Sequence, residues 1–431
     1  MKFFPTRRRS VSSVAGVLAM FALALWGIGC GDVFRPVAIP ITGPPGDPQQ
    51  SHLTFVVSDN APANDGSVTH VNVAGDTNVH VSAVGVEPVH AALLPDGSHI
   101  FVVNHDSDTV TSYLPGIASV APTTLNLPTG SSPVFIHTTE QAKIYTANFG
   151  RNSVGVISAA SNAFSTEIPV GTNPVALAET HDGKKLYSVN QGDGTVSVID
   201  TANAVVLGTI PLGVGSSPVW ALLSSDGLSL YVLDRGLSNI AVIDTLTDRA
   251  LGSVRVGASP NHMFLDPRLN RLYVTNQGDN TVSVLDASLP PPGIPKLLTF
   301  VPVPPTPTAV AALPNGTRAY VSSLGVNVAA ATGTVSVTVI DTASNKVLQT
   351  VRFDTSSAVC DASVRFRSFV AASVDSAKFY VSSCDAGTTH ILSSATNTEI
   401  ASIASPVSAF APAKAGAQPP PQRPVFILPG Q

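Results

Sequence analysis

The sequence repeats itself along most of its length, and this repeat constrains the fold more than any other feature. An aromatic residue recurs at the same place in each unit, and successive copies lie 42 to 47 residues apart, except for a last interval of 60. Six of the seven tyrosines occupy this position. A period of this length is typical of stacked supersecondary units that share one core. The eight aromatic anchors are Phe55, Phe101, Tyr145, Tyr187, Tyr231, Tyr273, Tyr320 and Tyr380.

Each unit contains four short runs rich in Val, Ile, Thr and Tyr, separated by Gly, Asn, Asp and Pro, a composition that predicts strands and turns. Asp182-Gly183 and Asp226-Gly227 predict hairpin turns, because glycine accepts a positive φ without strain. A ring of four-stranded antiparallel sheets buries the sheet faces and leaves few open edges. The repeat therefore predicts an all-β protein, a β-propeller. In the fourth unit the predicted strands are 174–180, 184–190, 194–200 and 204–211.

Eight anchors predict eight blades, with seven as the alternative because the last unit is irregular. The first unit, residues 53–84, lacks an opening strand, and the stretch 424–428 near the C-terminus matches the missing one. We therefore expect the C-terminal strand to complete the N-terminal blade, which removes an open edge. The long last interval predicts an inserted loop at 354–366.

The motif Tyr-Val-Thr-Asn at 273–276, followed by Asn-Thr-Val-Ser-Val at 280–284, resembles the YVTN family of β-propeller repeats. The resemblance covers residues 52–430. It implies the fold but little about function, because the shared residues are structural. An enzyme of lactonase or quinoprotein-dehydrogenase type, with its site at the central channel, is the alternative function.

The first fifty residues predict export. Four cations precede an uncharged, mostly apolar stretch at 11–29, which is followed at once by Cys30. Residues 25–30 resemble a bacterial lipoprotein cleavage site, although Gly27 stands where that pattern prefers Leu. An ordinary cleaved signal peptide and an uncleaved anchor remain alternatives.

These features predict three parts. They are a signal peptide at 1–29, a lipidated Cys30 with a Pro-rich extended tether at 30–51, and one propeller domain at 52–431. We expect a monomer in the bacterial cell envelope, on the periplasmic or cell-surface side, held to the membrane by its lipid alone.

Two further observations concern the cysteines and the net charge of the exported chain. Cys360 and Cys384 are the only cysteines after residue 30, which in an exported chain favours one disulfide over two free thiols. After residues 1–29 are removed, the chain carries 19 basic and 28 acidic residues. A net negative chain lacks the basic footprint of a nucleic-acid-binding protein.

Candidate ligand-binding residues occupy two positions that vary between units, near the start of the first strand and just after the second. A mixed aromatic and amide lining of the channel would suit a ligand, and the alternative is that the aromatic side chains simply fill the channel. The candidates are His90, Asn104, Phe135, Asn148, Asn190, Trp220, Asp234, Arg235, His262 and Asn276.

We expect no catalytic residue, cofactor or metal. No Ser-His-Asp order, phosphate-binding loop or haem motif is present. The histidines His90, His105 and His262 lie in different units without local ligand spacing. The sequence thus favours a rigid platform that binds an envelope protein or a small ligand.

Overall fold

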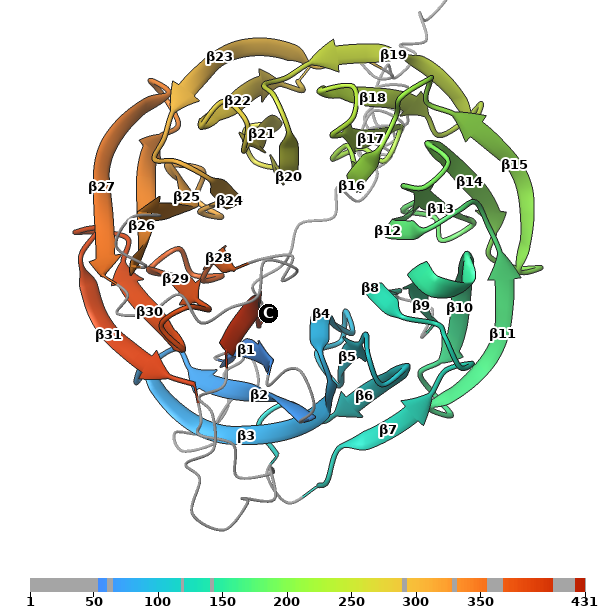
Figure 1. The fold of residues 1–431 in the computed structure, drawn as a ribbon, viewed down its shortest axis with the longest axis horizontal. Coiled ribbons are helices and arrows are strands. Elements are labelled where there is room, and N and C mark those ends of the chain that lie inside the picture. Colours follow the sequence, from blue (N-terminus) through green and yellow to red (C-terminus); the bar gives the residue numbers. More distant parts are fainter. Residues whose placement is uncertain are drawn as a thin grey trace, which may run out of the picture. The chain divides into compact units, whose positions relative to one another are not determined.

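Eight four-stranded antiparallel sheets surround a central axis, which makes the protein an eight-bladed β-propeller (Figure 1). All described residues belong to the compact unit formed by 43–431. The anchor spacing predicted eight blades, and this prediction is confirmed. The computed structural model describes residues 53–59, 65–117, 120–139, 143–288, 293–327, 332–354, 367–405 and 423–430.

The blades are numbered here in chain order, and their strands are given from the innermost to the outermost. Blade 1 consists of β32 (Arg423–Pro429), β1 (Leu53–Asp59), β2 (Asp65–Asn72) and β3 (Thr77–Val86). Blades 2 to 4 consist of β4 (Pro88–Leu93), β5 (Ile100–Asn104), β6 (Thr109–Tyr113), β7 (Thr123–Asn126); β8 (Pro133–Thr138), β9 (Lys143–Asn148), β10 (Ser153–Ser158), β11 (Ala163–Pro169); and β12 (Pro174–Glu179), β13 (Lys185–Asn190), β14 (Thr195–Asp200), β15 (Val205–Pro211).

Blades 5 to 8 continue the same order. Blades 5 and 6 consist of β16 (Pro218–Leu223), β17 (Ser229–Asp234), β18 (Asn239–Asp244), β19 (Arg249–Arg255); and β20 (Pro260–Asp266), β21 (Arg271–Asn276), β22 (Thr281–Asp286), β23 (Lys296–Pro302). Blades 7 and 8 consist of β24 (Pro307–Ala312), β25 (Arg318–Asn327), β26 (Thr332–Asp341), β27 (Lys346–Asp354); and β28 (Ser368–Ala372), β29 (Lys378–Ser383), β30 (Thr388–Ser393), β31 (Glu399–Ala404).

The aromatic anchors sit on the second strand of each blade and are 0 to 2% exposed. They pack between blades, as shown by Tyr320 of blade 7, whose ring stacks 3.8 Å from that of Phe379 in blade 8. The outermost strands are mostly exposed, and a register shift between Val198 and Ile199 distorts the pairing of β14 with β15. Six other blades have the same shift at this place. Such bulges twist an edge away from foreign strands.

The two ends of the propeller chain meet in blade 1, where the blue β1 lies beside the red β32 (Figure 1). The strands pair antiparallel, with Val57 opposite Phe426 and Phe55 opposite Leu428. The Gly430 amide also donates to the Leu53 carbonyl at 2.9 Å. The predicted closure by the C-terminal strand is therefore confirmed.

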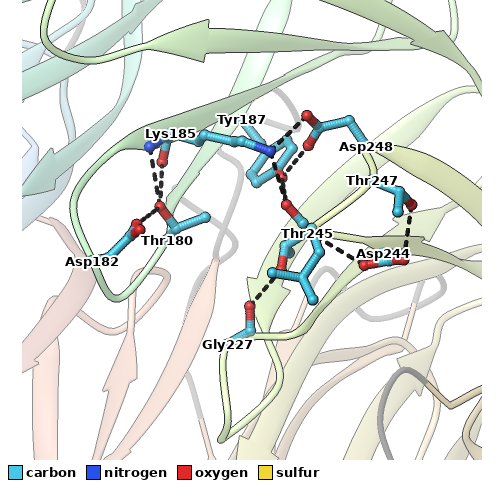
Figure 2. Close-up of polar contacts among 10 residues, drawn as sticks. Thr180, Asp182, Lys185, Tyr187, Gly227, Asp244, Thr245, Thr247 and Asp248 are labelled. Carbon is cyan, nitrogen blue, oxygen red and sulfur yellow. Dashed lines mark hydrogen bonds and ion pairs between the residues drawn. The ribbon is translucent and has the colours of Figure 1, made fainter.

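A cation two residues before the anchor ties one blade to the turn of the next (Figure 2). Lys185 Nζ donates to the Thr245 carbonyl at 2.9 Å and pairs with Asp248 Oδ2 at 2.6 Å, while the Tyr187 hydroxyl donates to Asp248 Oδ1 at 2.7 Å. The Lys378 ammonium does the same across the chain ends, from blade 8 to Val73 and Asp76 of blade 1. The other ties run from Lys143 to Thr201, from Arg271 to Thr342 and Asn345, and from Arg318 to Ser394 and Asn397.

Several predictions made from sequence fall outside the described residues. They concern the signal peptide and tether at 1–51, Cys30, Cys360 and the inserted loop after Asp354. Cys384 is buried and disulfide-bonded, and its pairing with Cys360 stays a prediction. Across the described ranges, no helix is long and apolar enough to cross a membrane.

Candidate functional site

The channel is lined by one residue from each innermost strand. In seven of these strands it lies two places after a proline, which is the first residue of six strands and the second residue, Pro424, of β32. In blade 2, Pro88 pairs with Asn104 but His90 pairs with Val103, so the strand is bulged between them. The same shift occurs at the start of β8, β12, β16, β20 and β24. The repeated bulge therefore sets the channel-lining position in a constant way.

Aromatic side chains from six blades meet at this position and form a closed circuit of ring contacts. Blades 4 and 7 contribute Ala176 and Ala309 instead, both fully buried, and these small residues leave room for the large ones. Edge and stacked aromatic pairs each add about 0.5–1.5 kcal/mol beyond the burial of their area. The centroid distances are His90–Phe135 4.2 Å, Phe135–Trp220 5.7 Å, Trp220–His262 4.7 Å, His262–Phe369 5.6 Å, Phe369–Phe426 4.7 Å and Phe426–His90 4.6 Å.

These rings fill the channel at their level. Five of the six residues are 4 to 8% exposed, and Trp220 alone is half-buried. Sequence reasoning named four members of the circuit as candidates, and a fifth, Phe426, lies in the stretch 424–428 that was matched to the missing strand. It missed Phe369, because β28 begins with Ser368 instead of proline and has no bulge, so that Phe369 follows Ser368 directly. The match between Phe-Val-Ala-Ala at 369–372 and Ala-Val-Ala-Ala at 309–312 was the available signal.

The predicted amide residues lie in the blades rather than in the channel circuit. Asn104, Asn148, Asn190 and Asn276 expose no surface. Asn190 Nδ2 donates to Thr195 Oγ1 at 2.9 Å and to Ser197 Oγ at 3.0 Å. The amide nitrogens of Asn104, Asn148 and Asn276 also donate to hydroxyls of the third strand. These side chains therefore tie the second strand to the third.

Asp234 and Arg235 follow the second strand of blade 5 and differ in exposure. Asp234 is fully buried, and its Oδ1 accepts from the backbone amides of Ser217 and Leu237, each at 3.0 Å. Arg235 is exposed and donates to Gln277 Oε1 of blade 6 at 3.3 Å. Asp234 thus shapes the loop, and Arg235 presents a cation on it.

Three titratable side chains lie close together in blade 2, in the loop before β4 and the loop after β5. His105 Nδ1 lies 2.8 Å from Asp106 Oδ1 and 3.2 Å from Glu87 Oε2. The hydrogen bond with Glu87 and then that with Asp106 raise the pKa of His105, against the effect of partial burial. The pKa of Asp106 is lowered, chiefly by hydrogen bonding with Glu87. Sequence reasoning named His105 but did not foresee this grouping, because Glu87 lies in a different loop.

The sequence matches no protein-family model and no curated protein. Its fold is similar to that of many solved structures. The dihydro-heme d1 dehydrogenase NirN aligns with a TM-score of 0.65 at 13% identity, covering 86% of this chain and 76% of that one. AztD from Citrobacter koseri aligns with a TM-score of 0.60 at 15% identity, covering 88% and 98%.

A putative 6-phosphogluconolactonase from Bacteroides fragilis aligns with a TM-score of 0.56 at 16% identity, covering 71% of this chain and 94% of the other. At these identities the likeness establishes the β-propeller fold. Unrelated functions share such a fold, so the function has to be argued from the site.

Proposed function

We propose that the protein is a YVTN-like β-propeller that acts as a binding or scaffold platform in the bacterial cell envelope. Its partner would be an envelope protein or a small ligand, bound on the face formed by the loops that follow the second strands. Loops on a rigid frame are where binding residues concentrate. The proposal also includes a monomeric state and attachment to the membrane through a lipid on Cys30.

The observation that carries the proposal is a constant backbone frame with varied side chains. In five blades the residue that follows the second strand donates its amide to the loop that precedes the innermost strand. Yet the side chain at this place differs from blade to blade, as His105, Gln191, Arg235 and Gln277 show. The amide-to-carbonyl distances are 2.8 Å for His105–Glu87, 2.9 Å for Gln191–Asn173, 3.1 Å for Arg235–Ser217 and 3.1 Å for Gln277–Ser259.

The filled channel supports the same proposal. A lactonase or quinoprotein dehydrogenase with its site on the axis would need an open chamber there. The structure has packed rings at that level, with His90 and Phe135 stacked 4.2 Å apart. Substrate access to the axis would require the aromatic circuit to open.

Site-specific crosslinking tests the binding face. A photo-reactive amino acid is placed at Arg235 on the loop face and, as a control, at Leu246, which is 71% exposed in the turn at the opposite end of the same blade. The crosslinkers are activated in intact cells. We expect a defined adduct from position 235 and none from 246. Equal adducts from both positions, or an adduct from 246 alone, would overturn the proposal.

The anchor is tested separately. Cells that express the full chain are fed an alkyne-tagged fatty acid, and labelling of the wild type is compared with that of Cys30→Ser. We expect label only on the wild type. Equal labelling of the two proteins, or none on the wild type, would remove the lipid anchor from the proposal and leave the binding face untouched.

A further inference from the structure

We propose that the loop face of blade 2 binds one divalent transition-metal ion of the zinc class through Glu87 Oε2, His105 Nδ1 and Asp106 Oδ1. This inference is independent of the proposed platform function. It also replaces the expectation, drawn from the sequence, that no metal is bound.

The three donor atoms are already spaced as metal ligands. His105 Nδ1 lies 2.8 Å from Asp106 Oδ1 and 3.2 Å from Glu87 Oε2, and all three atoms lie within 4.8 Å of one another. Two ligands at 2.0–2.1 Å from a tetrahedral zinc ion are about 3.3 Å apart. The cluster therefore needs only small side-chain movements to close around an ion.

The cluster is open on one side. The side chains of His105, Glu87 and Asp106 are 30%, 27% and 47% exposed. An ion can enter from solvent, and water can complete its coordination, as in zinc sites that have three protein ligands and a free position. The imidazole favours zinc-like ions over Ca²⁺ and Mg²⁺, which prefer oxygen donors.

Other blades carry different residues at the positions of Glu87, His105 and Asp106. In blade 4 the three places hold Asn173, Gln191 and Gly192, and in blade 6 they hold Ser259, Gln277 and Gly278. None of these sets combines an imidazole with carboxylates. Blade 2 is thus singled out, among the described residues, as the place where all three positions carry metal-binding groups.

Only one of these differences is sterically unfavourable in another blade. A Cβ atom at Gly192 would lie 2.6 Å from the side-chain atom Asn173 Oδ1, yet the equivalent residue of blade 2 is Asp106. Glu87 has φ 53°, the left-handed conformation that Ser132, Asn173, Ser259 and Thr306 also adopt at this position. The shared backbone conformation therefore accommodates Glu87, but it does not require a carboxylate at this position or at that of Asp106.

Blade 8 is the one other described blade that carries an aspartate at the position of Asp106, which is glycine in blades 4 and 6. The two blades differ in the charge that faces this aspartate. In blade 8, Asp385 lies opposite Arg367, whose Nη2 contacts its two oxygens at 2.7 and 2.6 Å. The guanidinium neutralises that carboxylate. In blade 2, two carboxylates face a single imidazole. A divalent cation bound to a neutral His105 balances both negative charges.

The test variants take their residues from blade 4, where the same backbone carries them. They are Glu87→Asn, His105→Gln and Asp106→Gly, made singly and together. The triple variant gives blade 2 the three residues that blade 4 has at these positions. Chelator-treated, untagged protein is titrated with ZnCl2 by isothermal titration calorimetry. The control is His137→Ala, which removes a surface histidine that has a single carboxylate, Glu179, at 3.8 Å.

We expect the wild type and His137→Ala to bind one zinc ion alike, each single variant to bind about 10-fold more weakly, and the triple variant at least 100-fold more weakly. Melting temperatures without metal should be equal, which shows that the variants fold. The proposal is overturned if the wild type does not bind zinc or if the triple variant binds as tightly as the wild type. It is also overturned if Ca²⁺ or Mg²⁺ binds as tightly as zinc.

Discussion

The closing strand β32 should depend on Phe426, which is 6% exposed and lies between two other rings of the channel. Its centroid is 4.6 Å from that of His90 and 4.7 Å from that of Phe369. Truncation of a buried phenylalanine to alanine costs about 3–5 kcal/mol. In Phe426→Ala this loss of stability concerns β32, a terminal strand that can detach while the other blades stay folded.

Hydrogen exchange measured by mass spectrometry detects this detachment as faster exchange of the backbone amides of β1, the strand that pairs with β32. Each 1.4 kcal/mol of lost local stability speeds exchange tenfold, so the β1 amides of Phe426→Ala should exchange about 100-fold faster or more. The matched control is Phe135→Ala, whose ring is 8% exposed and contacts His90 and Trp220 in the same channel. It should leave β1 unchanged. Equal acceleration in the two variants, or none in Phe426→Ala, would refute closure through this ring.

Two further predictions concern stability. Burial, with a smaller effect of His80, lowers the pKa of His70 from 6.5 to about 3. The unfolded chain therefore takes up a proton between pH 6.5 and 3 while the folded one does not. Stability should fall by up to about 5 kcal/mol as the pH drops through this range. Urea unfolding at pH 7 and pH 4 should show the loss, and His70→Gln should reduce it; an unchanged pH dependence would contradict the assignment. Lys378→Met breaks the tie to Asp76, in which both side chains are under 20% exposed, and should cost about 1–3 kcal/mol. Lys184→Met, which loses a pair whose side chains are 79% and 55% exposed, should unfold at the wild-type urea midpoint. Equal midpoints for the two variants would show that the tie contributes nothing.

The fold was largely predictable because the repeat reports both strand positions and their stacking. The strands of blade 4, Pro174–Glu179, Lys185–Asn190, Thr195–Asp200 and Val205–Pro211, begin and end within one residue of the predicted ranges. Closure was predictable because Pro-Val-Phe-Ile at 424–427 repeats the pattern that opens other blades.

The candidate site was less predictable, because side-chain direction depends on the strand bulges. From its position in the repeat, Asn190 was expected to line the channel together with residues such as His90. In the structure its amide points into the blade and donates to Ser197 Oγ. Glu87 and His105 are 18 residues apart, and no local spacing marks them as neighbours. They meet because the loop before one strand bonds the loop after the next.

The central claim is that a partner binds the loop face while the aromatic circuit keeps the channel closed. Hydrogen-exchange footprinting of the complex with the partner crosslinked at position 235 tests it most directly. The account predicts protection of the loops at 105–108, 191–194 and 235–238, with no change in β16 or β20. Protection confined to those inner strands, or to the turns at 182–184 and 246–248 on the opposite end, would contradict it.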